Sequence, residues 1–394
     1  MSLPDLVPNP PAAEPMSAQR GEMLGMDDFE GLTVGDPDDC PCDFYHRAAI
    51  NWMSFIRDDV RLIDLVIPGS HDSATYSMRG AARPFVQTQS YNLLAQLLCG
   101  IRYLDLRVRG SAARPVVNHN IVKGRATEHL LRRQVAPFVH RFPSEVLILD
   151  FQELGRPCRR TVVEQLREHL DADRWALPRS RFSTTLTLGD LRAGGYRFLV
   201  LFGGMSEAEF QRARREGWLP EWVLRRGDVL HSPYDAVLYA RGTSGIPAFL
   251  TSHSQAWATK RDRLFVAQGV CRQNFVATAI DALRELAKGV RGRSWWRLPD
   301  TPAWLDTHQG HHLDGWIDAL TPESPANILM RDFVDRHYAT IGKALRLNLQ
   351  RGHAVPGEAA TRLDTIAGML EHGREWCAAR QMPDDAGFFS ASAT

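Results

Sequence analysis

The sequence lacks the segments that would carry it into or across a membrane. No apolar stretch approaches the roughly eighteen residues that a transmembrane helix needs. Residues 1–14 contain prolines and acids, whereas a signal peptide needs a basic patch followed by an apolar core. We therefore expect no signal peptide and no transmembrane segment, and a chain that is cytoplasmic or peripherally bound to a membrane.

The chain also has almost no net charge and few cysteines. The 47 basic and 46 acidic residues leave a net charge of +1, which gives no indication of a nucleic-acid partner. The six cysteines are scattered along 394 residues, so reduced thiols are the default expectation. Cys40, Cys42 and His46 fit no common zinc spacing, and we predict no metal there. The sequence identifies no protein partner.

The chain divides into three parts by composition. Residues 1–47 are rich in Pro, Asp, Gly and Met and show no sustained periodicity, which predicts a disordered leader. Residues 48–352 alternate short apolar runs with helical patterns and form the predicted main domain. Residues 353–394 hold an amphipathic segment at 360–380, which predicts a C-terminal helix followed by a frayed tail.

The main domain carries the alternation of strands and helices that is typical of a parallel barrel. Helical spacing is clearest at residues 91–98, 161–170 and 275–288. We expect strands at residues 62–68, 103–108, 115–118, 146–151, 197–202, 237–239, 264–270 and 327–333. About eight alternations predict an α/β fold with a (β/α)₈ TIM-type barrel, regular or distorted. A doubly wound sheet is the alternative, although no glycine fingerprint follows the first strand.

Polar side chains stand where several of these strands end. In a parallel barrel these ends meet at one face, where active sites gather. The candidates are His71 and Asp72 after the first strand, Asp105 and Arg107 on the second, His119 after the third, Gln152 after the fourth and Asp332 near the end of the last. Each residue alone has a structural explanation, such as a buried ion pair between Asp105 and Arg107. Their joint occurrence indicates a functional site.

Two histidines with an arginine between them suit cleavage of a phosphodiester without a metal. One imidazole can take a proton while the other gives one, and a guanidinium can hold the phosphoryl oxygens. His71, Arg107 and His119 have this order in the sequence. We therefore expect an enzyme that acts on a phosphodiester.

The motifs around these residues resemble the phosphatidylinositol-specific phospholipase C X-domain family, including the bacterial enzymes, the X-domain-only proteins and a glycosylphosphatidylinositol-cleaving enzyme. The resemblance extends from about residue 52 to residue 334. Its carriers are PGSHDS at 68–73, GIRYLDLR at 100–107, His119, SEVLILDF at 144–151 and NILMRDFV at 327–334. The first two motifs are specific in combination, whereas the later ones are mostly apolar strand sequence.

The resemblance implies a role for each residue. His71 would be the general base that removes a proton from the inositol 2-hydroxyl, and Asp332 would orient its imidazole. His119 would protonate the departing diacylglycerol oxygen with support from Asp72, while Arg107 would stabilise the non-bridging oxygens. The product would be a cyclic inositol phosphate.

The resemblance also bears on metals and on the sugar. Calcium-dependent relatives carry an acid where this chain has Arg107, and an arginine there would repel a cation. No metal and no cofactor are therefore expected. Asp105 would position Arg107 or His71, and Gln152 stands where relatives contact the sugar ring.

The expected substrate is a membrane lipid, either a phosphoinositide or a glycosylphosphatidylinositol. The run RGRSWWR at 291–297 interleaves arginines with Trp295 and Trp296, which suits transient contact with a bilayer surface. Two alternatives remain open. One is a metal-dependent glycerophosphodiester phosphodiesterase on the same barrel. The other is an inactive module that binds an inositol headgroup, because Asn120 follows His119 where most relatives carry glycine.

Overall fold

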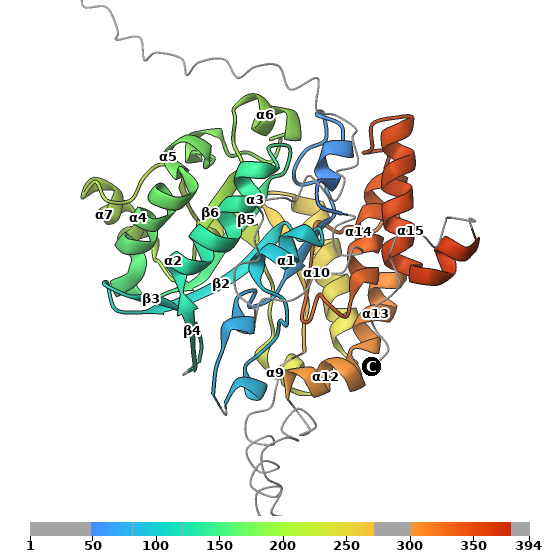
Figure 1. Cartoon of the computed structure of the whole chain (residues 1–394), viewed down its shortest axis with the longest axis horizontal. Helices are drawn as coiled ribbons and strands as arrows, with labels where there is room; N and C mark the ends of the chain where they lie inside the picture. Colours follow the sequence, from blue (N-terminus) through green and yellow to red (C-terminus); the bar gives the residue numbers. More distant parts are fainter. Residues whose placement is uncertain (1–48, 81, 121, 272–300, 380–394) are drawn as a thin grey trace, which may run out of the picture.

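The computed structural model describes residues 49–80, 82–120, 122–271 and 301–379 (Figure 1). The predicted leader up to residue 47, the predicted helix at 275–288 and the predicted tail lie outside these residues. The proposed division into leader, barrel and C-terminal extension therefore stays a prediction. None of the described helices combines the length and the apolar character needed to cross a bilayer.

The centre of the molecule is a curled sheet of parallel strands. Its neighbours pair in the order β7-β6-β5-β2-β1-β10-β9-β8. These strands are β1 (Ile67–Ser70), β2 (Tyr103–Gly110), β5 (Leu147–Leu154), β6 (Phe198–Phe202), β7 (Val223–Arg225), β8 (Leu230–His231), β9 (Leu264–Gly269) and β10 (Ile328–Arg331). Among the described strands, β7 and β8 are the two ends of this order and do not pair with each other. The predicted α/β barrel of the TIM type is therefore confirmed in a distorted, open form.

The segment predicted as the third barrel strand is a strand, but its predicted place in the parallel barrel is wrong. Residues 115–118 lie in β3 (Pro115–His119), which pairs antiparallel with the far end of β2 and with β4 (Val122–Ala126). The eight-residue β2 extends beyond the barrel and turns back into this hairpin. A short apolar run has the same composition in a parallel and an antiparallel strand, so the sequence pattern could not separate the two.

The strand predicted at residues 237–239 is a helix, α9 (Ala236–Ala240). Its start is fixed by Asp235, whose carboxylate accepts hydrogen bonds from Val237 N at 2.8 Å and Leu238 N at 3.0 Å. Such an N-cap outweighs the weak β preference of a short segment. The barrel strands in this region are instead β7 and β8, which are too short to produce a pattern. Likewise, only the end of the segment at 62–68 is a strand, because β1 begins at Ile67.

Helices cover the outside of the barrel (Figure 1). The helix expected at 91–98 is α1 (Leu93–Leu98), which begins after Asn92, whose side chain accepts from Ala95 N at 2.8 Å. The helices expected at 161–170 and 360–380 correspond to α4 (Arg159–Leu170) and α15 (Glu358–Ala379). The others are α2 (Thr127–Leu130), α3 (Ala136–Arg141), α5 (Ala172–Trp175), α6 (Leu188–Ala193), α7 (Glu207–Arg215), α8 (Arg226–Val229), α10 (Ile246–Lys260), α12 (Pro302–Gln309), α13 (His311–Asp318) and α14 (Tyr338–Gln350).

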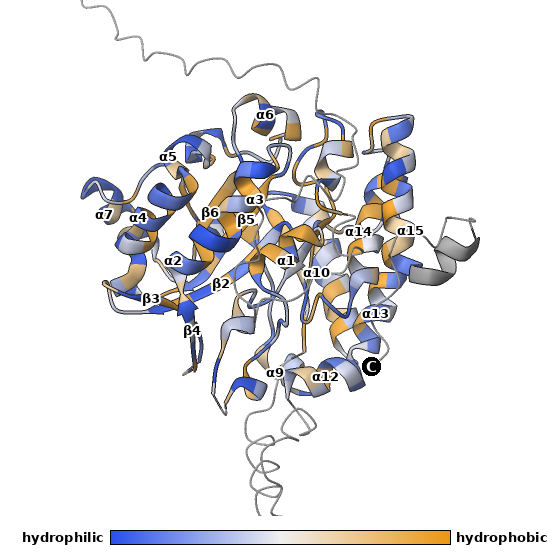
Figure 2. Cartoon of the chain, in the orientation of Figure 1, coloured by the Kyte–Doolittle hydropathy of each residue, from blue (hydrophilic) through white to orange (hydrophobic). Residues whose placement is uncertain are grey.

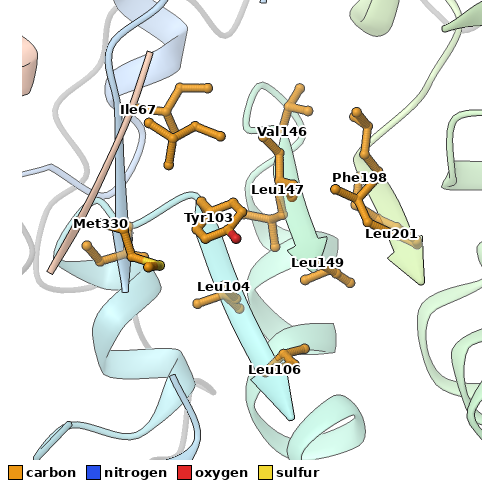
Figure 3. Packing of buried hydrophobic residues seen from close by; sticks show 14 of the residues in the cluster. Ile67, Tyr103, Leu104, Leu106, Val146, Leu147, Leu149, Phe198, Leu201 and Met330 are labelled. Carbon is orange, nitrogen blue, oxygen red and sulfur yellow. The ribbon is translucent and has the colours of Figure 1, made fainter. Parts of the chain in front are cut away.

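The core lies inside the sheet and between the sheet and its helices. Strands covered on both faces are nearly continuously apolar, and β5 and β6 are accordingly among the most hydrophobic elements in Figure 2. Tyr103 and Leu104 lie next to Leu147 and Leu149 on the neighbouring strand, and all four are buried (Figure 3). Rigid strands therefore support the polar residues at their carboxyl ends.

A buried ion pair closes the amino-terminal end of the barrel. Arg102, just before β2, donates from Nε to Glu145 Oε2 at 2.8 Å, and neither side chain is exposed. Its Nη1 donates to the carbonyls of Leu97 and Ile101 at 2.8 and 2.9 Å. The pair is enclosed by its own hydrogen bonds and serves the fold.

Candidate active site

His71 and Asp332 form a pair at the carboxyl ends of the first and last strands. Because β1 and β10 are parallel neighbours with Ser70 opposite Arg331, the residues that follow them leave the sheet together. His71 Nδ1 lies 2.7 Å from Asp332 Oδ1. The other carboxylate oxygen accepts a hydrogen bond from Cys271 N at 3.1 Å, which fixes the carboxylate plane. Asp332 is buried, whereas His71 keeps an exposed edge of 13%.

Asp72, Asp105 and Arg107 form a charged cluster beside this pair. Asp105 and Arg107 alternate on β2 and therefore project toward the same side of the strand. The Nε of Arg107 contacts Asp72 Oδ1, and its Nη2 lies 3.5 Å from Asp105 Oδ2. The Asp72 backbone N–H also donates to Asp105 Oδ2, at 3.2 Å. Both carboxylates are almost completely buried, so they hold the guanidinium in place.

The arginine also contacts the first histidine. Arg107 Nη2 lies 3.0 Å from His71 Nε2. A guanidinium can only donate, so this hydrogen bond requires a neutral ring with its lone pair on Nε2 and its proton on Nδ1, toward Asp332. When the ring is protonated, Nε2–H instead has the Asp72 carboxylate as a partner at 3.5 Å.

His119 reaches the site on the β3–β4 hairpin and not on a barrel strand. Its Nδ1 donates to the carbonyl of Val86 at 2.7 Å and lies 3.5 Å from Asp72 Oδ2. Asn120 follows in the left-handed region with φ of 55°, which turns the chain sharply after the histidine. Asparagine tolerates this conformation better than most residues, so its presence in place of glycine is compatible with the turn.

Burial and neighbouring charges perturb the protonation of the cluster in opposite directions. Burial favours the neutral form of His71, but Asp72 and Asp332 outweigh it and raise the pKa of His71 to about 9. Burial raises the pKa of Asp105 to about 6, against the attraction of Arg107. Burial also disfavours the charged form of Asp72, but Arg107 and the two histidines hold the pKa of that carboxyl below its usual range. Asp72 is therefore the central anion of the site.

Three side chains of this cluster could offer ligands to a cation. One ligand atom each from His71, Asp72 and Asp105 lies within 4.8 Å of the others. Arg107 contacts the same two carboxylates, and its guanidinium places a positive charge where a metal would bind. The donor set therefore fits a metal poorly unless Arg107 moves.

The edge of the site on β5 carries Gln152 and Glu153. With its amide nitrogen oriented toward Asp105, Gln152 donates to Oδ1 at 3.1 Å and to Oδ2 at 3.3 Å. Glu153 lies 3.6 Å from Arg107 Nη1 and 3.3 Å from Arg109 Nη2, with 43% of its side chain exposed. Gln152 thus supports Asp105 in this structure, where the sequence suggested contact with a sugar.

The structure brings seven of the nine predicted site residues into one region, while Trp295 and Trp296 lie outside the described residues. Sequence reasoning missed the Val86 carbonyl, which fixes His119, and Gln89, whose buried amide contacts the backbone beside His71 and Asp332. A backbone carbonyl leaves no trace in a sequence. The polar run Gln87-Thr88-Gln89 was the signal that could have drawn attention to the second feature.

Fold and site together define a distorted TIM-type barrel with two histidines and an arginine at its carboxyl end. No family model matches the chain. A 1-phosphatidylinositol phosphodiesterase of Staphylococcus aureus (strain Newman) is 26% identical over 113 residues, which cover 28% of this chain and 36% of that protein. A PI-PLC X-box domain-containing protein of Dictyostelium discoideum is 29% identical over 325 residues, covering 74% of this chain and 40% of its own length.

The solved structures establish the fold. The phosphatidylinositol-specific phospholipase C of Listeria monocytogenes matches with a TM-score of 0.53 and 18% identity, covering 76% of this chain and 98% of that one. The chain is thus related to the phosphatidylinositol-specific phospholipase C and X-domain-containing proteins, as its motifs predict. Its sequence matches span 36% and 40% of the length of these two curated relatives.

Proposed function

We propose that this chain is a phosphodiesterase of the phosphatidylinositol-specific phospholipase C type, which cleaves phosphatidylinositol or its glycosylated form. One observation carries the proposal: both imidazoles and the guanidinium surround a single carboxylate. Asp72 Oδ2 lies 3.5 Å from His71 Nε2 and 3.5 Å from His119 Nδ1, while Oδ1 contacts Arg107. A base, an acid and an anion-binding group therefore converge within reach of one phosphate.

His71 is the proposed general base. Asp332 on Nδ1 leaves Nε2 to face the site, so the neutral ring can remove the proton from the 2-hydroxyl of the inositol. That oxygen attacks the adjacent phosphorus and forms the cyclic ester as the bond from phosphorus to the glycerol oxygen breaks.

His119 is the proposed general acid. With Nδ1–H donated to the Val86 carbonyl, the second ring proton of the charged imidazole is free for the departing diacylglycerol oxygen. The Asp72 carboxylate lies 3.5 Å from the same ring nitrogen and helps to fix the orientation of the ring. One proton leaves the hydroxyl for His71 and one leaves His119 for diacylglycerol, so the step is balanced.

Arg107 is the proposed partner of the non-bridging phosphoryl oxygens. Its guanidinium contacts His71 Nε2 and the Asp72 carboxylate, and 18% of the Arg107 side chain is exposed. Planar bidentate donors match phosphate geometry, and a permanent positive charge can replace the cation that metal-dependent relatives use. We therefore propose a metal-independent reaction. The glycerophosphodiester phosphodiesterase alternative would require Arg107 to give up Asp72 and Asp105 to a metal.

The proposed partner is a lipid in a bilayer, so the chain would contact the membrane surface transiently. Trp295 and Trp296 remain the predicted contact residues.

Turnover of phosphatidylinositol in mixed micelles with excess EDTA tests the proposal directly. Phosphorus NMR should reveal a cyclic inositol phosphate, and His71→Ala should form it about 10²–10⁴-fold more slowly. Turnover that appears only after a divalent cation is added would favour the metal-dependent alternative. No turnover of either phosphatidylinositol or its glycosylated form by a folded sample would contradict the activity and favour the headgroup-binding module.

A further inference from the structure

A buried amide joins the two turns that carry His71 and Asp332. Gln89 is fully buried and lies outside the set of residues that would contact a substrate. Its Nε2 donates to the carbonyl of His71 and to the carbonyl of Arg331, both at 3.0 Å. Its Oε1 accepts from the Val334 N–H at 3.2 Å. Both amide protons and the carbonyl oxygen are therefore engaged with backbone.

These backbone groups belong to the peptide units next to the catalytic pair. The His71 carbonyl is part of the peptide that leads into Asp72, and the Arg331 carbonyl is part of the peptide that leads into Asp332. The amide can be oriented in only one way, because two acceptors face its nitrogen and one donor faces its oxygen. One side chain thus bridges the ends of β1 and β10, in addition to the backbone hydrogen bond from His71 N to the Arg331 carbonyl at 3.0 Å.

Both turns contain a strained residue. Asp72 and Phe333 each have φ of 44°, a left-handed conformation that is unfavourable for a bulky residue such as Phe333 and less so for aspartate. Such residues persist only where the surroundings fix them. The segment that contains Gln89 also holds both turns through Thr88, whose carbonyl accepts from Phe333 N at 2.7 Å and whose hydroxyl donates to the His71 carbonyl at 3.2 Å.

We propose that Gln89 is a positioning residue that keeps the His71 imidazole against the Asp332 carboxylate. The inference rests on the proposed function of that pair and adds a residue that acts through it. Without the amide, the His71 and Arg331 carbonyls each lose one of their two donors and the Val334 N–H loses its acceptor, so both turns are held less firmly. The 2.7 Å contact between Nδ1 and Oδ1 would lengthen, and Nε2 would lose its aim at the substrate hydroxyl.

Gln89→Met tests the proposal because methionine fills a similar volume and makes none of the three hydrogen bonds. The matched control is Gln134→Met. Gln134 is also buried, and its Oε1 accepts from Tyr76 Oη at 2.7 Å and from Leu93 N at 3.1 Å, away from the catalytic pair. Both variants remove buried hydrogen bonds from a glutamine, but only one of them touches the turns.

We expect Gln89→Met to lower kcat about 10- to 100-fold while KM is unchanged, the range typical of residues that orient a reacting group. The pKa of His71 should also fall, because Asp332 moves away while Asp72, Asp105 and Arg107 still face the ring. An NMR titration of the His71 ring proton, assigned by its absence in His71→Ala, measures this change. Gln134→Met should keep the wild-type kcat and titration.

Unchanged kcat and unchanged His71 titration in folded Gln89→Met would overturn the proposal, and so would equal losses in both methionine variants. If Gln89→Met does not fold, Gln89→Asn takes its place, since an amide one methylene shorter cannot span both turns. A folded Gln89→Asn variant with wild-type kcat and titration would then overturn it. The titration needs no substrate, so it still tests whether Gln89 positions His71 against Asp332 if the wild-type chain cleaves no lipid.

Discussion

Two arginines lie at opposite ends of the barrel, Arg102 just before β2 and Arg107 on it, and each forms an ion pair with a buried carboxylate. Arg102, at the amino-terminal end, has Glu145 as its ion-pair partner and satisfies its remaining donors with backbone carbonyls, with no exposed surface. Arg107, at the carboxyl-terminal end, contacts Asp72, Asp105 and Glu153 and keeps 18% of its side chain exposed. The first arginine is closed to any ligand and the second is open.

The difference is also one of charge balance. Burial lowers the pKa of Arg102 despite its single carboxylate, whereas the carboxylates around Arg107 outweigh burial and raise the pKa of that guanidinium. The same surplus of carboxylates lets His71 carry a proton. A structural ion pair is neutral and complete, whereas this site holds excess anionic groups that raise the pKa of His71.

The largest expected effect is the loss of either histidine at the open end. His71→Ala and His119→Ala should each lower kcat by about 10²–10⁴, because each removes one proton-transfer group. Thermal unfolding should remain close to wild type, since both rings lie at the surface of the site and keep an exposed edge. Retention of most activity by either variant would refute the role assigned to that histidine.

The next effect concerns the Arg102–Glu145 pair at the amino-terminal end of the barrel and should appear in the free energy of unfolding. Glu145→Ala leaves the buried Arg102 charge without its counter-ion, which should lower the free energy of unfolding by about 3–5 kcal/mol. Glu153→Ala is the control, because a half-exposed pair contributes about 0–1 kcal/mol. Urea unfolding of both variants gives the comparison. Equal losses would mean that the two ends do not differ as described.

Some elements of the fold and the site could be predicted from the sequence and others could not. Buried parallel strands appear as apolar runs, so the barrel and the placement of His71 and Asp332 at adjoining strand ends could be predicted. The route of His119 could not, because Pro115–His119 looks like a barrel strand and pairs as a hairpin. The two- and three-residue strands β8 and β7 leave no pattern at all.

The supporting contacts were the least predictable part of the site. The Gln89 side chain binds a backbone carbonyl, and the His119 ring is held by one. Tertiary packing brings these groups together, so residue type alone does not reveal the contacts. Gln152 was expected near a sugar and is found against Asp105. Sequence patterns identify groups that carry charge, whereas the groups that orient them emerge only when the chain is folded.

Arg107→Lys should weaken catalysis without closing the site. A lysine keeps the charge, but its single ammonium cannot contact Asp72 and two phosphoryl oxygens together. We expect kcat to fall by about 10²–10³, the range for removal of a preorganised donor. Assays with EDTA and with added calcium separate two explanations, because activity restored by calcium would mean that the vacated carboxylates accept a metal.

The smallest predicted effect is a displacement of the pH profile. His71 must be neutral to act as a base, so kcat/KM should rise with pH through its pKa of about 9. Asp332→Asn removes the anion that lies 2.7 Å from Nδ1, and the pKa should fall toward the ordinary value of about 6.5. The rising limb should therefore move to lower pH, although maximal activity falls because an amide can favour the wrong tautomer. If the rising limb of the pH profile does not move, then Asp72, and not Asp332, raises the pKa of His71. Asp332 would then orient the ring without changing its pKa.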